Sequence, residues 1–131
     1  MTRISGLIAL IAALTGQAAY GDEIRHLAIA ATLFGTWASS AQNCDAKDKA
    51  NFVIAGSEYG HANTSCAVEW VVETAGTSGP NYSVHAACTD LSQPSVKHVE
   101  NLIMRPDAPG KITIGTTFSD QQPYQRCADA R

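Results

Sequence analysis

The fold is decided by the stretch Thr64–Thr74, which reads TSCAVEWVVET. Apolar side chains occupy alternate positions in it, at Cys66, Val68, Trp70 and Val72. Glu69 and Glu73 have the opposite parity. Because successive side chains of a strand point to opposite faces, this pattern predicts a strand with one apolar and one solvated face.

A second alternating run follows, with apolar side chains at Tyr82, Val84, Ala86 and Cys88. The intervening residues 75–81 read AGTSGPN and have the composition of a turn. The two runs therefore predict a β-hairpin whose inner face carries one cysteine on each arm.

Residues 1–21 have the organisation of a signal peptide. A basic lead that ends at Arg3 precedes an apolar run over residues 4–14, which is too short to span a bilayer. Small residues follow, and cleavage is predicted after Ala18 or Gly21. We therefore expect the mature chain to be exported. No membrane anchor is expected, because no cysteine stands at the cleavage point to receive a lipid.

A second apolar stretch, residues 27–38, reads LAIAATLFGTWA and leaves two interpretations open. It is signal-like itself, which would imply a misassigned start and cleavage near Ala41. We favour keeping it in the mature chain, with residues 22–31 as a linker or short helical lead and residues 32–131 as one domain.

The mature chain is acidic. Removing residues 1–21 from the 131 leaves 110 residues with eight Lys and Arg against twelve Asp and Glu, a formal net charge of −4. Nucleic-acid and anionic-membrane binders carry clustered basic residues, so neither kind of partner is expected. A chain of this length forms one domain, and we expect a monomer.

Four cysteines in an exported chain predict two disulfides rather than free buried thiols. With the turn centred near Thr77, Cys66 and Cys88 face each other, and facing Cβ atoms lie about 4.5–5.5 Å apart, close to what a disulfide needs. The predicted pairs are Cys66–Cys88 and Cys44–Cys127. The sequential pairing, Cys44–Cys66 with Cys88–Cys127, remains the alternative.

The rest of the chain consists of short apolar runs between Gly- and Pro-rich turns, with turns predicted over residues 56–63 and 105–110. Residues 96–105 fit either a helical stripe or a strand, and we favour a strand over residues 99–104. The count predicts an all-β domain, a small antiparallel β-barrel or sandwich of about seven to eight short strands stapled by disulfides. We favour the barrel, because closure removes exposed strand edges.

Phe34-Gly35-Thr36-Trp37 resembles the G-x-W opening of lipocalin-like barrels and of the bacterial metalloprotease-inhibitor (Inh) family. With the ordered cysteines, residues 33–127 resemble small uncharacterised exported proteins of alphaproteobacteria. The resemblance implies a bacterial protein of the periplasm or a secreted one, a barrel that Trp37 closes at one end, and Arg126 as the candidate to stack on Trp37. The chain departs from both families, since lipocalins are longer and the inhibitors carry two cysteines rather than four.

No motif points to chemistry. His61, His85 and His98 lack metal-ligand spacing, and oxidised cysteines cannot ligate zinc as thiolates. Glu69 and Glu73 would lie about 13 Å apart along a strand, too far for a glycosidase pair. We therefore expect no catalytic residue, no metal and no cofactor, and the protein is not expected to be an enzyme.

Binding remains. Trp70, Tyr82 and Phe118 are candidate ligand-lining residues, although all three rings also suit the core of so small a barrel. The first functional hypothesis is a binding module that inhibits a protein such as a protease or lysozyme, through the segment before Trp37 or through residues 56–63. The alternatives are a lipocalin-like carrier of a small apolar ligand and a structural protein of the envelope.

Overall fold

The computed structural model describes residues 23–45, 50–77 and 79–128, so the predicted signal peptide lies outside the described residues. None of the described helices is long and apolar enough to cross a membrane. In chain order the elements are β1 Ile24–His26, η1 Ala31–Leu33, β2 Gly35–Ala38, η2 Ala41–Cys44, β3 Phe52–Ile54, β4 Glu58–His61, β5 Thr64–Thr74, β6 Asn81–Asp90, β7 Gln93–Ala108, β8 Lys111–Gly115 and β9 Gln122–Arg126, where η1 and η2 are short 3-10 turns.

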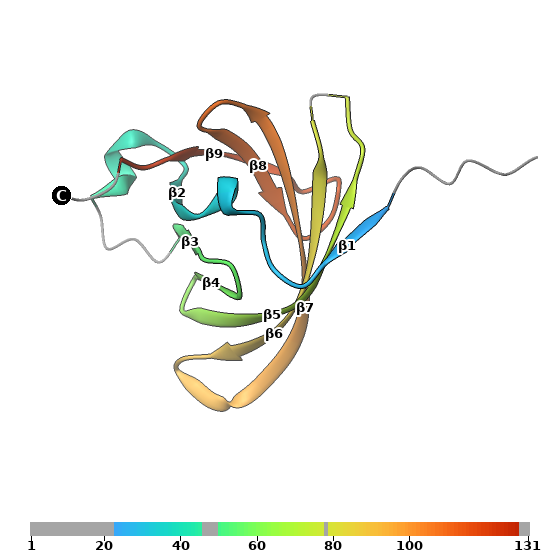
Figure 1. Ribbon diagram of the computed structural model, residues 1–131. Coiled ribbons are helices and arrows are strands. Elements are labelled where there is room, and N and C mark those ends of the chain that lie inside the picture. The colour runs from blue at the N-terminus through green and yellow to red at the C-terminus, as the bar shows by residue number, and fades with distance from the viewer. Residues whose placement is uncertain (1–22, 46–49, 78, 129–131) are drawn as a thin grey trace, which may run out of the picture.

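Strands β2 to β9 form a closed antiparallel barrel (Figure 1). Each strand pairs with the next along the chain, and β9 pairs with β2 to complete the ring. β1 lies outside the ring and pairs with the part of β5 that extends beyond β4. The predicted all-β barrel is therefore confirmed. β5, β6 and β7 are its longest strands, and Figure 1 shows them as one twisted sheet along the barrel.

The strand that completes the ring is β2. It pairs with β3 on one edge and with β9 on the other, and its residues Trp37 and Ala38 are buried. A chain that began near Ala41 would lack this strand and Leu33, which is also buried. The barrel therefore needs the segment that the alternative start would remove.

The β5–β6 hairpin has the register that its sequence predicts at the cysteines. Cys66 is the direct partner of Cys88, and they form a disulfide with Cα atoms 4.0 Å apart. Cys44 and Cys127 form the second disulfide, with Cα atoms 5.5 Å apart. The nested pairing is confirmed and the sequential alternative is excluded.

Along β5 the predicted inner face is right only as far as Val68. The pairing with β6 shifts by one residue between Val68 and Trp70, because a β-bulge places Glu69 as an extra residue in β5. Beyond the bulge the parity reverses, so Val71 is fully buried, whereas Trp70 lies on the outer face. The placement of Trp70 on the inner face is therefore wrong. On β6 the predicted inner residues are all buried, at Tyr82, Val84, Ala86 and Cys88.

The barrel interior is filled by its own side chains. They form one cluster that includes Trp37, Phe52, Ile54, Tyr59, Val71, Val84, Leu102, Met104, Ile112 and Ile114. Interior packing of this density is what holds a small domain together, since burial of apolar surface is the main stabilising term.

Trp37 is buried in the core of the barrel. Its side chain is 3 % exposed, and its Nε1–H donates to the Leu33 carbonyl at 3.0 Å. Arg126 lies over the ring, with Cζ 4.4 Å from the ring centroid. The contact is present, although family membership does not follow from it.

Three segments differ from their prediction. The sequence predicts a turn over residues 56–63, but these residues contain strand β4, in which Tyr59 is buried. The turns themselves are the short segments on either side of β4. β7 includes the favoured strand at residues 99–104 but extends from Gln93 to Ala108, so the turn predicted over residues 105–110 shrinks to Pro109 and Gly110. The expected linker over residues 22–31 contains β1 and the buried Ile29.

Candidate functional site

The structure does not bring the three candidate ligand-lining residues together. Tyr82 is buried in the core on β6, and Trp70 lies on the outer face of β5 because of the bulge. Phe118 is 66 % exposed in the β8–β9 connection rather than on a strand. An aromatic pocket built from these three rings is therefore not formed.

Trp70 instead belongs to a polar stack on the outer surface. Its ring lies parallel to that of His85, with centroids 3.9 Å apart, and Arg25 of β1 places Cζ 5.2 Å from the Trp70 ring. His85 Nδ1 in turn lies 3.0 Å from Asn101 Oδ1. A cation beside a tryptophan face is attracted to it, so Arg25 helps to hold β1 against the barrel.

A polar network leads from the buried Tyr59, beside the Cys66–Cys88 disulfide, to the surface. Tyr59 donates from its hydroxyl to Glu100 Oε1 at 2.9 Å, and Glu100 Oε2 lies 3.5 Å from His98 Nε2. Burial, followed by the Glu100 carboxylate, raises the pKa of Tyr59 well above its usual range. Tyr59 therefore keeps its proton and remains a donor at any physiological pH.

In the oxidised protein the two cysteines beside this network offer no thiolate to a metal. The sulfur atoms of Cys66 and Cys88 and the Glu100 carboxylate lie within 4.8 Å of one another, but both sulfurs are in the disulfide. A disulfide sulfur is not the thiolate that zinc binds. His61 lies near this end of the barrel and stacks on Phe52 with centroids 3.8 Å apart, and burial lowers its pKa.

The N-terminal segment, which we define as residues 24–34, forms an apolar surface. Leu27 is 80 % exposed, Ile24 is 49 % exposed, and Phe34 is also exposed. The segment is nevertheless held in place, because β1 pairs with β5 and the Ile29 amide donates to the Gly56 carbonyl at 2.8 Å.

Two open hollows flank β1. One, of about 520 Å³, is lined by residues 26–30 and Glu73. The other, of about 330 Å³, is lined by Ile24, residues 73–76, Gly79 and Pro80. The N-terminal segment therefore presents apolar side chains together with concave surface on both sides, which is the shape that a protein partner can fill.

Of the two predicted recognition segments, only the one before Trp37 has this character. Residues 56–63 are mostly strand β4, and the ring of Tyr59 is in the core. The pairing of β1 with β5 could not be predicted from the sequence, since three residues are too few for a periodic pattern to appear.

No family model, curated protein or solved structure matches this chain. The resemblance to lipocalin-like barrels and to the metalloprotease-inhibitor family therefore stays a prediction. A small β-barrel by itself names no function, because unrelated functions share such folds. The function has to be argued from the surfaces of the barrel.

Proposed function

We propose that this chain is an exported binding module that acts on another protein through its N-terminal segment, as an inhibitor of an enzyme such as a protease or lysozyme. The observation that carries the proposal is the contrast between a filled interior and an exposed apolar segment. Leu27 and Ile24 are exposed while the barrel interior is packed with side chains of the protein itself.

The filled interior favours a protein partner over a small apolar ligand. A carrier needs a cavity that buries most of its ligand, typically about 300–1,000 Å³ and lined by apolar side chains. Here Trp37, Tyr59 and Met104 pack into the space where a lipocalin-like ligand would lie, and each is 3 % exposed or less.

The exposed apolar segment supports the same choice. An isolated exposed hydrophobic residue needs no explanation, but several together beside concave surface are typical of interaction sites. β1 holds them in a defined position through three residue pairs with β5 and through Arg25 on Trp70. A partner would therefore meet a segment that is already ordered, which lowers the entropic cost of binding.

Export is supported by the two disulfides, because such bonds persist in oxidising compartments. It agrees with the signal-like residues 1–21 of the sequence. An inhibitor in that compartment would protect the cell from its own enzymes or from foreign ones.

The test is capture from a periplasmic extract on the immobilised protein, identification of the bound protein by mass spectrometry, and assay of that protein's activity. We expect stoichiometric inhibition by the wild type and loss of inhibition in Leu27→Asp. Phe118→Asp is the matched control, since it introduces the same charge at an exposed apolar residue outside the N-terminal segment, in the β8–β9 connection. Equal loss in both variants, or capture without inhibition, would contradict the proposed mode.

The carrier hypothesis makes a different prediction. If the protein carries a small apolar molecule, solvent extraction of the purified protein should release one in stoichiometric amount, and its removal should lower the unfolding temperature. An extract with no such molecule, and no partner captured by wild type, would favour a structural role in the envelope.

A further inference from the structure

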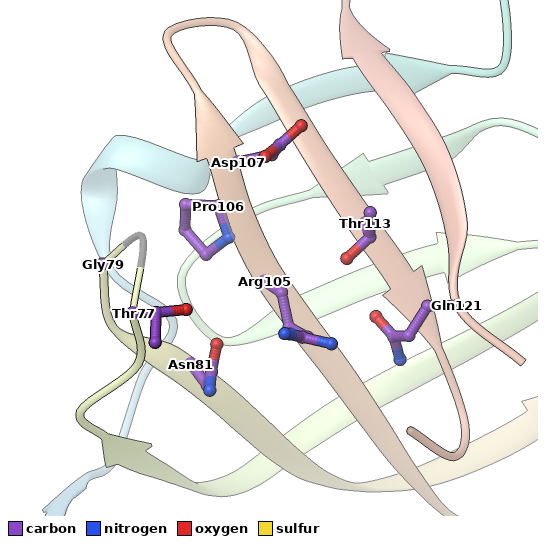
Figure 2. A pocket seen from close by; sticks show the side chains of 8 residues that line it. All are labelled: Thr77, Gly79, Asn81, Arg105, Pro106, Asp107, Thr113 and Gln121. Carbon is purple, nitrogen blue, oxygen red and sulfur yellow. The ribbon is translucent and has the colours of Figure 1, made fainter. Parts of the chain in front are cut away.

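A polar hollow of about 220 Å³ lies on the outer face of the barrel wall (Figure 2). Its floor is formed by Arg105 of β7 and Thr113 of β8, which are direct partners across these strands. Asn81, Thr77 and Gly79 line one side, and Gln121 of the β8–β9 connection lines the other. The hollow is too small for a drug-sized ligand and suits one small chemical group.

The Gln121 wall is built by a hydrogen-bonded loop. Asp120 accepts from Thr116 Oγ1 at 2.8 Å, from the Thr117 amide at 2.7 Å and from Thr117 Oγ1 at 2.9 Å. A Cβ on Gly115 would lie 2.7 Å from Asp120 Oδ1, so only glycine lets the loop lie this close to β8. The loop is therefore ordered without help from a ligand.

Within this loop the Gln121 side chain has one polar atom without a partner. Its Nε2 donates to the Thr117 carbonyl at 2.8 Å, which fixes the orientation of the amide. Its Oε1 is buried and accepts no hydrogen bond from any of the described residues. Buried acceptors are nearly always satisfied, so this oxygen lacks the donor that such an atom usually has.

The Arg105 guanidinium is also without a charged partner. Neither of the ion pairs among residues 23–45, 50–77 and 79–128 includes it. Figure 2 shows the guanidinium directed between Asn81 and Gln121, while the Asp107 carboxylate points the other way along β7. A guanidinium presents donors in a planar fork that matches a carboxylate bidentately.

We propose that this hollow binds an α-carboxylate with an adjacent amide N–H, the group found at a peptide C-terminus and in N-acylated amino acids. The carboxylate pairs with Arg105, and the N–H donates to Gln121 Oε1, which is covered in the free protein and becomes accessible when the exposed Arg105 side chain turns onto the carboxylate. A singly charged group fits better than a phosphate, because one guanidinium faces it and Asp107 lies on the same face of β7 in a chain of net charge −3.

This site goes beyond the proposed function and does not depend on it. Gly79 lines both this hollow and the one beside Ile24, so a partner that covers the N-terminal segment can place its C-terminus here. A free N-acylated amino acid should bind as well, whatever the partner is.

The experiment is calorimetric titration of the purified, oxidised protein with N-acetylglycine, N-acetylglycinamide, acetate and inorganic phosphate. N-acetylglycine should bind best, because the amide derivative lacks the charge and acetate lacks the N–H. Arg105→Gln should weaken its binding at least about tenfold, as expected for loss of a charge-assisted bidentate contact. Gln121→Ala should erase the preference for N-acetylglycine over acetate.

Lys111→Gln is the matched control, since Lys111 is another exposed cation on β8 that does not line this hollow. Its binding should equal that of wild type. Equal weakening in Lys111→Gln and Arg105→Gln, tight binding of N-acetylglycinamide, or no binding of N-acetylglycine at millimolar concentration would each overturn the proposal.

A short peptide with a free C-terminus distinguishes the two sources of the group. If it binds about tenfold more tightly than N-acetylglycine, contacts beyond the last residue contribute and a partner's C-terminus is the source. Equal affinity identifies a free small acid. Both results support the site, whereas a failure of protein capture on the N-terminal segment would leave them unchanged.

Discussion

The guanidinium of Arg126 lies over the ring of Trp37, and the two residues are direct partners where the last barrel strand meets the first. Arg126 also donates from its two terminal nitrogens to the carbonyls of Phe34 and Thr32. One side chain thus connects β9, β2 and the turn η1 that precedes β2. Hydrogen bonds from a charged donor and a cation–π contact both stabilise this arrangement.

Trp37→Ala should therefore destabilise the protein strongly. Loss of a buried aromatic ring costs about 3–5 kcal/mol in the free energy of unfolding, which urea titration followed by circular dichroism will measure. A loss below about 1 kcal/mol, the size of an ordinary substitution, would show that the ring does not close the barrel.

Arg126→Lys tests the contacts of the guanidinium separately from its charge. A lysine keeps one positive charge but lacks the planar fork that reaches two carbonyls at once. The unfolding midpoint should fall, by less than in Trp37→Ala. Arg105→Lys is the control at an exposed arginine without these backbone acceptors, and an equal fall in both variants would contradict the stated role of Arg126.

The disulfide pairing predicts the products of proteolysis without reduction. Cleavage after glutamate at Glu69 and Glu73 separates Cys66 from Cys88, so their fragments should remain joined until a reductant is added. Cleavage after lysine and arginine should leave the fragments that hold Cys44 and Cys127 joined. A fragment in which Cys44 is joined to Cys66 would refute both the pairing and the barrel register.

The two tryptophans should differ in fluorescence. Trp70→Phe leaves only the buried Trp37, so emission should shift to shorter wavelength and iodide should quench it little. Trp37→Phe leaves Trp70 on the outer face, where quenching should be greater and should depend on Arg25 and His85. If iodide quenched the two variants equally, and circular dichroism showed both to be folded, Trp70 would be no more exposed than Trp37. That result would contradict the β-bulge at Glu69.

Tyrosine titration tests the buried hydroxyls. Burial raises the pKa of Tyr59, Tyr82 and Tyr124, with Glu100 and Glu73 adding to the effect on the first two. Unfolded tyrosines ionise near pH 10, so above about pH 10 the unfolded state releases protons that the folded state keeps. The contribution of these tyrosines to the free energy of unfolding is therefore fully present below about pH 10. It is lost as the pH rises toward their pKa values in the folded protein.

The measurement is tyrosinate absorbance in the native protein and in guanidinium chloride. The native curve should lie at higher pH than the denatured one. Tyr59→Phe should reduce the pH dependence of stability, by up to about 1.4 kcal/mol per pH unit for one proton. Coincident native and denatured curves would show that these hydroxyls are solvated.

The sequence predicts those parts of the fold that depend on local alternation. β6 and the cysteine register follow from period-two patterns and one turn, and both are confirmed. Beyond Val68 the alternation in β5 predicts the wrong face for each side chain. Trp70, Val71 and Val72 are all apolar and therefore conceal the change of parity at Glu69. No pattern of hydrophobicity reveals an inserted residue within such a run.

The Arg105 hollow is beyond the reach of sequence for another reason. Arg105 occurs in what the sequence predicts as a turn, whereas β7 continues through it to Ala108. Its surroundings come from Asn81 and Gln121, which are distant from it along the chain and approach only when β6, β7 and β8 are paired. Binding sites assembled in this way appear only once the strand order is known.

The Cys44–Cys127 bond spans the junction of β2 and β9, where the strand pairing is short and joins Trp37 with Arg126 and Ala38 with Gln125. Without that covalent bond the barrel can open between β2 and β9. Both strands would then have an unpaired edge, to which a strand of another copy of the chain can pair. We therefore expect oxidation of this bond to protect the chain against aggregation through strand edges. Expression of the protein in a reducing cytosol should yield fibrous or insoluble material, whereas export to an oxidising compartment should yield the closed barrel.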